Sequence, residues 1–161
     1  MKKAVFPGTF DPPSLGHLDI IQRASKVCDR LYVGIALNVA KPEELFSVSE
    51  RKAMLEEILK PLQNVEVVTF ESLVVDYVQK NQIDYIVRGL RALSNSEYEF
   101  RMALANRKMS GVETVFLMAD ESLSHISSSL IKEIGSFGHR LHDFVPKEIE
   151  EVVFRRISEK F

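Results

Sequence analysis

Five short apolar runs alternate along this chain with longer segments in which apolar residues recur at helical spacing. The apolar runs predict strands at residues 3–6, 31–36, 65–69, 84–88 and 114–118. The other segments predict helices at residues 15–28, 47–59, 74–81, 98–109, 127–134 and 146–157, the last with Pro146 in its first turn. Strands separated by helices form βαβ units with right-handed crossovers. The sequence therefore predicts an α/β fold with a doubly wound, five-stranded parallel sheet.

Length, charge and cysteine content narrow the class of protein. A chain of 161 residues predicts a single domain over residues 1–161. Its net charge of −2 argues against a general binder of nucleic acid or membrane surfaces, and no apolar stretch approaches the roughly 20 residues of a membrane span. No signal peptide is recognisable, so we expect a cytoplasmic protein. The single cysteine, Cys28, excludes an intrachain disulfide, and we expect it to pack at the end of the first helix.

Chemistry-bearing residues gather where the predicted strands end. Thr9 and His17 follow the first strand, Lys41 follows the second, Arg88 ends the fourth, and a run of serines follows the fifth. Ligands of doubly wound sheets bind outside the carboxyl ends of the strands. We therefore expect these residues to line one crevice.

The loop after the first strand, VFPGTFDPPSLGH, has the features of an anion site. Gly8 lets the backbone leave the strand sharply, and two prolines stiffen the approach to the helix. Ser14 is a plausible N-cap, which puts Gly16 and His17 in the first turn, where free N–H groups favour a phosphate. His17 can donate a hydrogen bond to the same anion. Taken alone, a histidine in a first turn is more often structural or solvated.

Two further segments carry groups that bind anions. Arg88 and Arg91 flank Gly89, and their forked donors suit phosphate oxygens, although in isolation they read as two solvated loop arginines. Ser127–Ser129 enter a helix and offer hydroxyls and free N–H groups, with an over-supplied N-cap as the alternative. His125 can be a surface residue without a role.

We expect no protein metal site. Asp11, Glu97, Glu99 and Asp120 have no recognisable metal-ligand spacing, and His139 and His142 lack a third partner.

Taken together, these motifs resemble one family. PGTFDPPSLGH, VRGLR, EYEF with ALANRKM, and ISSSLIKEI stand in the order and spacing of bacterial phosphopantetheine adenylyltransferases, from Ala4 to the FVPKEI segment. The wider group is the nucleotidyltransferase superfamily with a (T/H)xGH signature. The resemblance implies a Rossmann-like nucleotidyltransferase fold and a homohexamer. It also implies transfer of an adenylyl group from ATP to 4′-phosphopantetheine, giving dephospho-coenzyme A and pyrophosphate, with Mg²⁺ carried mainly by the ATP phosphates.

The resemblance also implies roles for individual residues. The catalytic positions it matches are His17, Thr9, Lys41 and Arg91. The positions that match ATP contacts are Thr9, Phe10, His17, Gly89, Leu90, Arg91, Glu99, Leu123, Ser124, His125, Ile126, Ser127, Ser128 and Ser129. The positions that match contacts of the acceptor are Thr9, Lys41, Val74 and Arg88.

The sequence departs from the family pattern at three places. Ser14 replaces the usual Thr or His of the signature. The loop that holds Lys41 is one residue longer and lacks a second lysine. Leu123 stands where an aromatic residue is usual, and His125 stands at a position that is commonly Phe.

Two other functions stay open beside this one. The first is a nucleotidyltransferase with a different acceptor, such as nicotinate mononucleotide or glycerol phosphate. The second is a non-catalytic nucleotide-sensing or redox module on the same fold. The RGLR and EYE motifs count against the first alternative, a different acceptor. Against the second, a flavodoxin-like binder has no need of His17, Lys41 and two arginines at one crevice.

Overall fold

The computed structural model describes residues 1–37, 43–91 and 93–161. Its centre is a five-stranded sheet formed by β1 (Lys3–Gly8), β2 (Arg30–Ile35), β3 (Val65–Thr69), β4 (Tyr85–Leu90) and β5 (Glu113–Met118). The strands lie in the order β3-β2-β1-β4-β5, and every neighbouring pair is parallel. This arrangement confirms the predicted doubly wound α/β fold.

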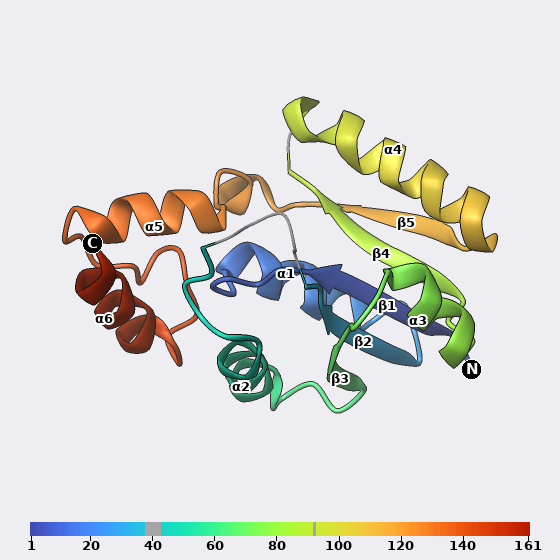
Figure 1. Cartoon of the computed structure of the whole chain (residues 1–161), viewed down its shortest axis with the longest axis horizontal. Coiled ribbons are helices and arrows are strands. Elements are labelled where there is room, and N and C mark those ends of the chain that lie inside the picture. Colours follow the sequence, from blue (N-terminus) through green and yellow to red (C-terminus); the bar gives the residue numbers. More distant parts are fainter. Residues whose placement is uncertain (38–42, 92) are drawn as a thin grey trace.

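Helices cover both faces of the sheet (Figure 1). They are α1 (Leu15–Ala24), α2 (Val48–Leu59), α3 (Val74–Asn81), α4 (Leu93–Ser110), α5 (Ser128–Ser136) and α6 (Glu150–Lys160), with a short 3₁₀ turn at Glu121–Leu123. Side chains of β1 alternate between two apolar clusters, as the pleat requires. Ala4 and Phe6 belong to the larger cluster, with residues of α1, α2, α5 and α6, whereas Val5 packs with Val78 of α3. Each face of the sheet thus has its own core.

Three helix boundaries differ from the sequence prediction by four residues or more. α1 ends at Ala24 rather than at residue 28, and beyond it the Ser25 hydroxyl donates to the carbonyl of Gln22 and the Cys28 thiol donates to the carbonyl of Ala24. Cys28 packs against the core there, as predicted.

The other two differences lie in α6 and α4. α6 begins at Glu150, so Pro146 is not in its first turn; residues 146–149 form a separate turn closed by the bond from Ile149 N to the Pro146 carbonyl. α4 begins at Leu93, five residues before the predicted start. Sequence periodicity misses this start because polar residues occupy the first turn of α4.

The sheet opens between its central strand, β1, and β4. β1 and β2 are paired over six residues, from Lys3 to Gly8, whereas β1 and β4 are paired at two, Ala4 with Tyr85 and Val5 with Ile86. The carboxyl ends of β1 and β4 therefore separate at the point where the strand order reverses, which is where ligands bind in such sheets. Among the described residues, no helix combines the length and apolar character that a membrane crossing needs.

Candidate active site

A cavity of about 340 Å³ lies at this opening. Its walls come from the loop after β1, the end of β4, the start of α1 and the N-terminus of α5. A volume of this order suits a small organic ligand. The predicted crevice is therefore present, and it draws together residues that stand more than 100 positions apart in the sequence.

Most of the predicted site residues line this cavity. They are Thr9, Phe10, His17, Arg88, Gly89, Arg91, Glu99, Leu123, Ile126, Ser127, Ser128 and Ser129. Four others lie outside the cavity wall, namely Val74, Leu90, Ser124 and His125. Val74 packs at the start of α3 against the smaller apolar cluster, and His125 is exposed. Lys41 lies outside the described residues.

His17 closes the first turn of α1 with its side chain. The Ser14 N–H donates to His17 Nδ1 at 3.0 Å, and the His17 N–H donates to Ser14 Oγ at 3.2 Å. This reciprocal pair is a capping box in which a histidine takes the place usually held by Glu or Gln. Because Nδ1 accepts a backbone proton, Nε2 carries the ring proton and remains the nitrogen available to a ligand.

The surroundings of His17 keep its imidazole neutral. Burial, together with the positive charges of Arg91 and Arg88, lowers the pKa of His17 to about 3. At neutral pH the ring is therefore an uncharged hydrogen-bond donor, and the arginines supply the positive charge of the site.

Phe10 forms the floor beneath His17 rather than an open contact surface. Its ring is 1 % exposed and packs edge-on against His17 at 4.8 Å and Phe6 at 5.7 Å. Its backbone has φ 53°, the left-handed region that a residue with a side chain rarely adopts. Gly8 makes room for this ring, since a Cβ there would lie 2.9 Å from it.

Arg88 is held by Glu99, which reaches it from α4. Arg88 Nε and Nη2 donate to the two carboxylate oxygens of Glu99 at 2.8 and 2.6 Å, and Nη1 donates to the carbonyl of Pro7. The Glu99 side chain is 4 % exposed, so this pair is well shielded from water. The two residues were assigned to different substrates in the sequence analysis, and the structure makes them one bidentate unit.

Arg91 and the start of α5 form the other wall. Arg91 Nη1 donates to the carbonyl of Ile126 at 2.6 Å, and no carboxylate among the described residues forms an ion pair with it. Ser127 Oγ accepts from Leu130 N at 3.1 Å, so it is the N-cap of α5. Ser128 Oγ donates to the carbonyl of Pro12 at 3.1 Å. Two of the three serine hydroxyls are thus occupied by bonds within the protein, and the first turn of α5, with its free N–H groups, lines the same cavity as Arg91.

Three charged residues of the cavity wall were missed by the sequence analysis. Lys132 lies in α5, with its Nζ 3.5 Å from Oδ2 of the buried Asp11, and its spacing of four from Ser128 could have revealed it. Glu43 and Glu44 line the cavity just before α2, and no sequence signal distinguishes them from solvated acids. Among the described residues, no group of three or more His, Cys, Asp or Glu side chains could hold a metal ion.

Comparison with known proteins places these features in context. Residues 5–134 match the cytidylyltransferase-like family. Two curated proteins named phosphopantetheine adenylyltransferase are each 46% identical to this chain. One, from Clostridium botulinum (strain Eklund 17B / Type B), aligns over 97% of this chain and 98% of its own length. The other, from Caldanaerobacter subterraneus subsp. tengcongensis, aligns over 100% and 98%.

The fold also matches solved structures. One from Vibrio parahaemolyticus, provisionally assigned as a nicotinate-nucleotide adenylyltransferase, superposes with a TM-score of 0.73 over 100% of this chain and 98% of its own. Its sequence identity is 19%, so this likeness concerns the fold alone.

Proposed function

The chain belongs to the cytidylyltransferase-like family and, within it, to the phosphopantetheine adenylyltransferases, and from this premise we propose that its cavity transfers an adenylyl group from ATP to 4′-phosphopantetheine. The products are dephospho-coenzyme A and pyrophosphate, a step of coenzyme A synthesis. The observation that carries the proposal is the 46% identity over 97% or more of the chain, since the aligned region spans the segments that form the cavity.

ATP occupies the wall formed by His17, Arg91 and the start of α5. His17 Nε2–H and Arg91 donate to oxygens of the triphosphate, and the N–H groups of Ser128 and Ser129 bind the leaving pyrophosphate. The proposal is supported by the fixed tautomer of His17 and by the absence of an ion-pair partner for Arg91 among the described residues. Because His17 is neutral, it donates a hydrogen bond to the phosphate and does not transfer a proton to it. The remaining ATP contacts in this proposal are Thr9, Phe10 and the Gly89–Leu90 backbone. Leu123–Ile126 surround the adenine base.

The reaction needs no nucleophile from the protein. A phosphate oxygen of the acceptor attacks the α-phosphorus of ATP in line, a new P–O bond forms, and the bond to the pyrophosphate oxygen breaks. Catalysis of such a step is mostly positioning and stabilisation of charge on the transferring group. Thr9, His17 and Arg91 supply this stabilisation, together with Lys41.

The acceptor lies on the Arg88 side of the cavity. Arg88, oriented by Glu99, offsets the repulsion between two anionic substrates, and this is supported by its bidentate geometry. Val74 contacts the pantetheine arm where it leaves the cavity. Lys41 is the other predicted phosphate contact.

Magnesium enters with ATP in this proposal. The described residues provide no cage of acidic or imidazole side chains, which is consistent with a Mg²⁺ ion carried mainly by the ATP phosphates. Bound there, it neutralises part of the triphosphate charge, while the residues above orient the reacting groups.

We also propose a homohexamer working in the cytoplasm, where ATP is available. Support for self-association comes from large apolar side chains that are exposed on α4 and β5, namely Tyr98, Phe100, Met102, Leu104, Met109, Val115 and Met118. Native mass spectrometry tests this directly, with a species of six 18.3 kDa chains expected. A monomer at micromolar concentration would contradict it.

The substrate assignment is tested by a panel of acceptors. Purified protein, ATP and Mg²⁺ are mixed with 4′-phosphopantetheine, nicotinate mononucleotide or glycerol phosphate, and pyrophosphate release is followed. We expect kcat/KM to be at least about 10³-fold higher with 4′-phosphopantetheine, because the cavity must pair the phosphate and the arm of the correct acceptor. Turnover with another acceptor alone would refute the substrate, and ATP binding without any turnover would favour a nucleotide-sensing module.

A further inference from the structure

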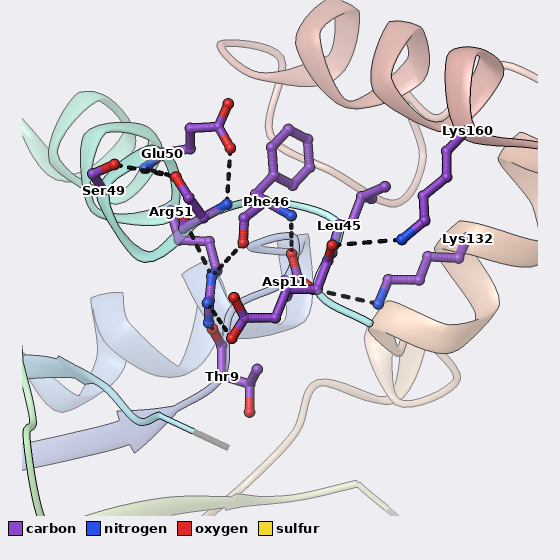
Figure 2. Close-up of polar contacts among 11 residues, drawn as sticks. Thr9, Asp11, Leu45, Phe46, Ser49, Glu50, Arg51, Lys132 and Lys160 are labelled. Carbon is purple, nitrogen blue, oxygen red and sulfur yellow. Dashed lines mark hydrogen bonds and ion pairs between the residues drawn. The ribbon is translucent and has the colours of Figure 1, made fainter. Parts of the chain in front are cut away.

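Arg51 is a completely buried cation next to the cavity, and the reaction above does not use it. It lies in the first turns of α2 with a side chain that is 0 % exposed. Its Nε donates to the Phe46 carbonyl at 3.0 Å, and its Nη1 donates to the Thr9 carbonyl at 2.9 Å (Figure 2). Nη2 lies 2.9 Å from Glu44 Oε1, an ion pair without a well-aligned hydrogen bond.

Local stability does not explain every contact of Arg51. The bonds to Phe46 and Ser47 and the ion pair with Glu44 all lie within seven residues of it and serve the start of α2. The bond to Thr9 spans 42 residues and reaches the wall of the cavity. Burying a guanidinium is costly, and an apolar side chain of similar volume often serves stability as well. The contact with Thr9 therefore calls for a functional explanation.

The Thr9 carbonyl belongs to a peptide group in an unusual orientation. This peptide joins Thr9 to Phe10, whose φ of 53° is unfavourable for a residue with a side chain. The Phe10 ring packs edge-on against His17 and Phe6. The bond from Arg51 fixes the carbonyl side of the same peptide, so the position of Thr9 depends on it directly.

The turn is held at its other end as well. Asp11 Oδ2 accepts from Leu45 N and Oδ1 accepts from Phe46 N, both at 2.8 Å, and Lys132 lies beside the carboxylate (Figure 2). Residues 44–51 are thus bonded to both ends of the turn at residues 9–11. Arg51 donates to the Thr9 carbonyl, and the N–H groups of Leu45 and Phe46 donate to Asp11.

We infer that Arg51 is a positioning residue for adenylyl transfer, which acts by holding the Thr9 hydroxyl in place through the Thr9 carbonyl. This inference rests on the proposed function. It predicts that loss of Arg51 lowers kcat more than it weakens binding of ATP, since a displacement of about 1 Å can cost on the order of 10²-fold in rate.

A double-mutant cycle tests the inference. The variants are Arg51→Met, Thr9→Val and the double variant, and kcat is divided by the number of ATP sites found by titration calorimetry, so that unfolded protein does not count. We expect Arg51→Met to lower kcat about 10- to 100-fold in the native background and less than about threefold in the Thr9→Val background. The KM for ATP should change by less than about threefold.

Two further variants complete the design. Arg156→Met is the matched control, because Arg156 holds the same segment through the Leu45 carbonyl and Glu50 without contacting Thr9, and it should keep kcat within about twofold. Arg51→Lys keeps the cation but replaces the two nitrogens that reach Phe46 and Thr9 by one, so its kcat should lie between those of the native protein and Arg51→Met. If Arg51→Met does not fold, Arg51→Lys takes its place in the double-mutant cycle.

The outcomes separate this inference from the proposed function. If the native protein is inactive with 4′-phosphopantetheine, the proposed function fails. If the native protein is active but the Arg51 substitution costs the same factor in both Thr9 backgrounds, or costs nothing, the positioning role is overturned and the reaction assignment stands.

Discussion

Replacing His17 by Asn separates the two roles of its imidazole. Nδ1 accepts the Ser14 N–H at 3.0 Å and completes the capping box, whereas Nε2 is left for the ligand. An Asn side-chain oxygen can accept from Ser14 but cannot reach the Nε2 position. His17→Asn should therefore cost no more than about 1 kcal/mol of stability, the value of a lost cap, while lowering kcat about 10²- to 10³-fold, the value of a lost donor at a transferring phosphoryl group.

The pH dependence identifies the form of His17 that acts. Because its pKa is lowered to about 3, the ring is neutral throughout pH 5–9, and it should contribute no inflection to kcat near pH 6.5. The assay is pyrophosphate release at saturating ATP and acceptor, for native protein and His17→Asn across that range. His142→Gln is a control, since His142 is an exposed surface residue outside the cavity.

Two results would refute this reasoning. One is a His17→Asn protein that keeps more than about a third of the native kcat, which would remove the donor from the mechanism. The other is a native profile with an inflection near pH 6.5 that is lost in His17→Asn, since a protonated imidazolium would then be the active form.

Three further predictions concern stability and the cavity. The unfolded chain protonates His17 near pH 6.5 and the folded chain only near pH 3, so stability to urea should fall as the pH drops through this window, and His17→Asn should flatten the fall. Gly34→Ala should destabilise the fold by about 2–3 kcal/mol in urea unfolding, because its Cβ would lie 2.0 Å from the Phe70 ring; an unchanged midpoint would show that β2 moves freely. Glu99→Gln should cost about 1–3 kcal/mol and raise the KM of the acceptor more than that of ATP, because Arg88 loses its charged bidentate partner; equal changes in both KM values would contradict the role of Arg88.

The sequence predicted the layout of the site better than its contacts. Apolar runs identified all five strands, and the rule on carboxyl ends then brought Thr9, His17, Arg88 and Arg91 to one cavity. Spacing also identified Ser14 as an N-cap. These features depend on local periodicity and on topology, both of which are encoded in short stretches of sequence.

The features that were missed depend on packing between distant segments. Arg51 sits in an amphipathic helix, where an arginine is typical of a solvated face, and its burial arises from acceptors 4 to 42 residues away. Glu99 pairs with Arg88 across two elements. Phe10 lines the cavity as predicted, but its burial beside His17 and its left-handed backbone depend on room that Gly8 leaves for its ring. Periodicity in the sequence carries no information on such pairings.

The most direct test of the account follows the α-phosphorus of ATP. Protein, Mg²⁺, 4′-phosphopantetheine and ATP labelled at the α-phosphorus are mixed, and the label is traced by chromatography and by mass spectrometry of the protein. Direct in-line transfer predicts that the label appears in dephospho-coenzyme A, with one unlabelled pyrophosphate released per label transferred and none attached to the protein. Label bound covalently to the protein, or released as AMP without reaching the acceptor, would contradict the claim that this cavity joins the two substrates directly.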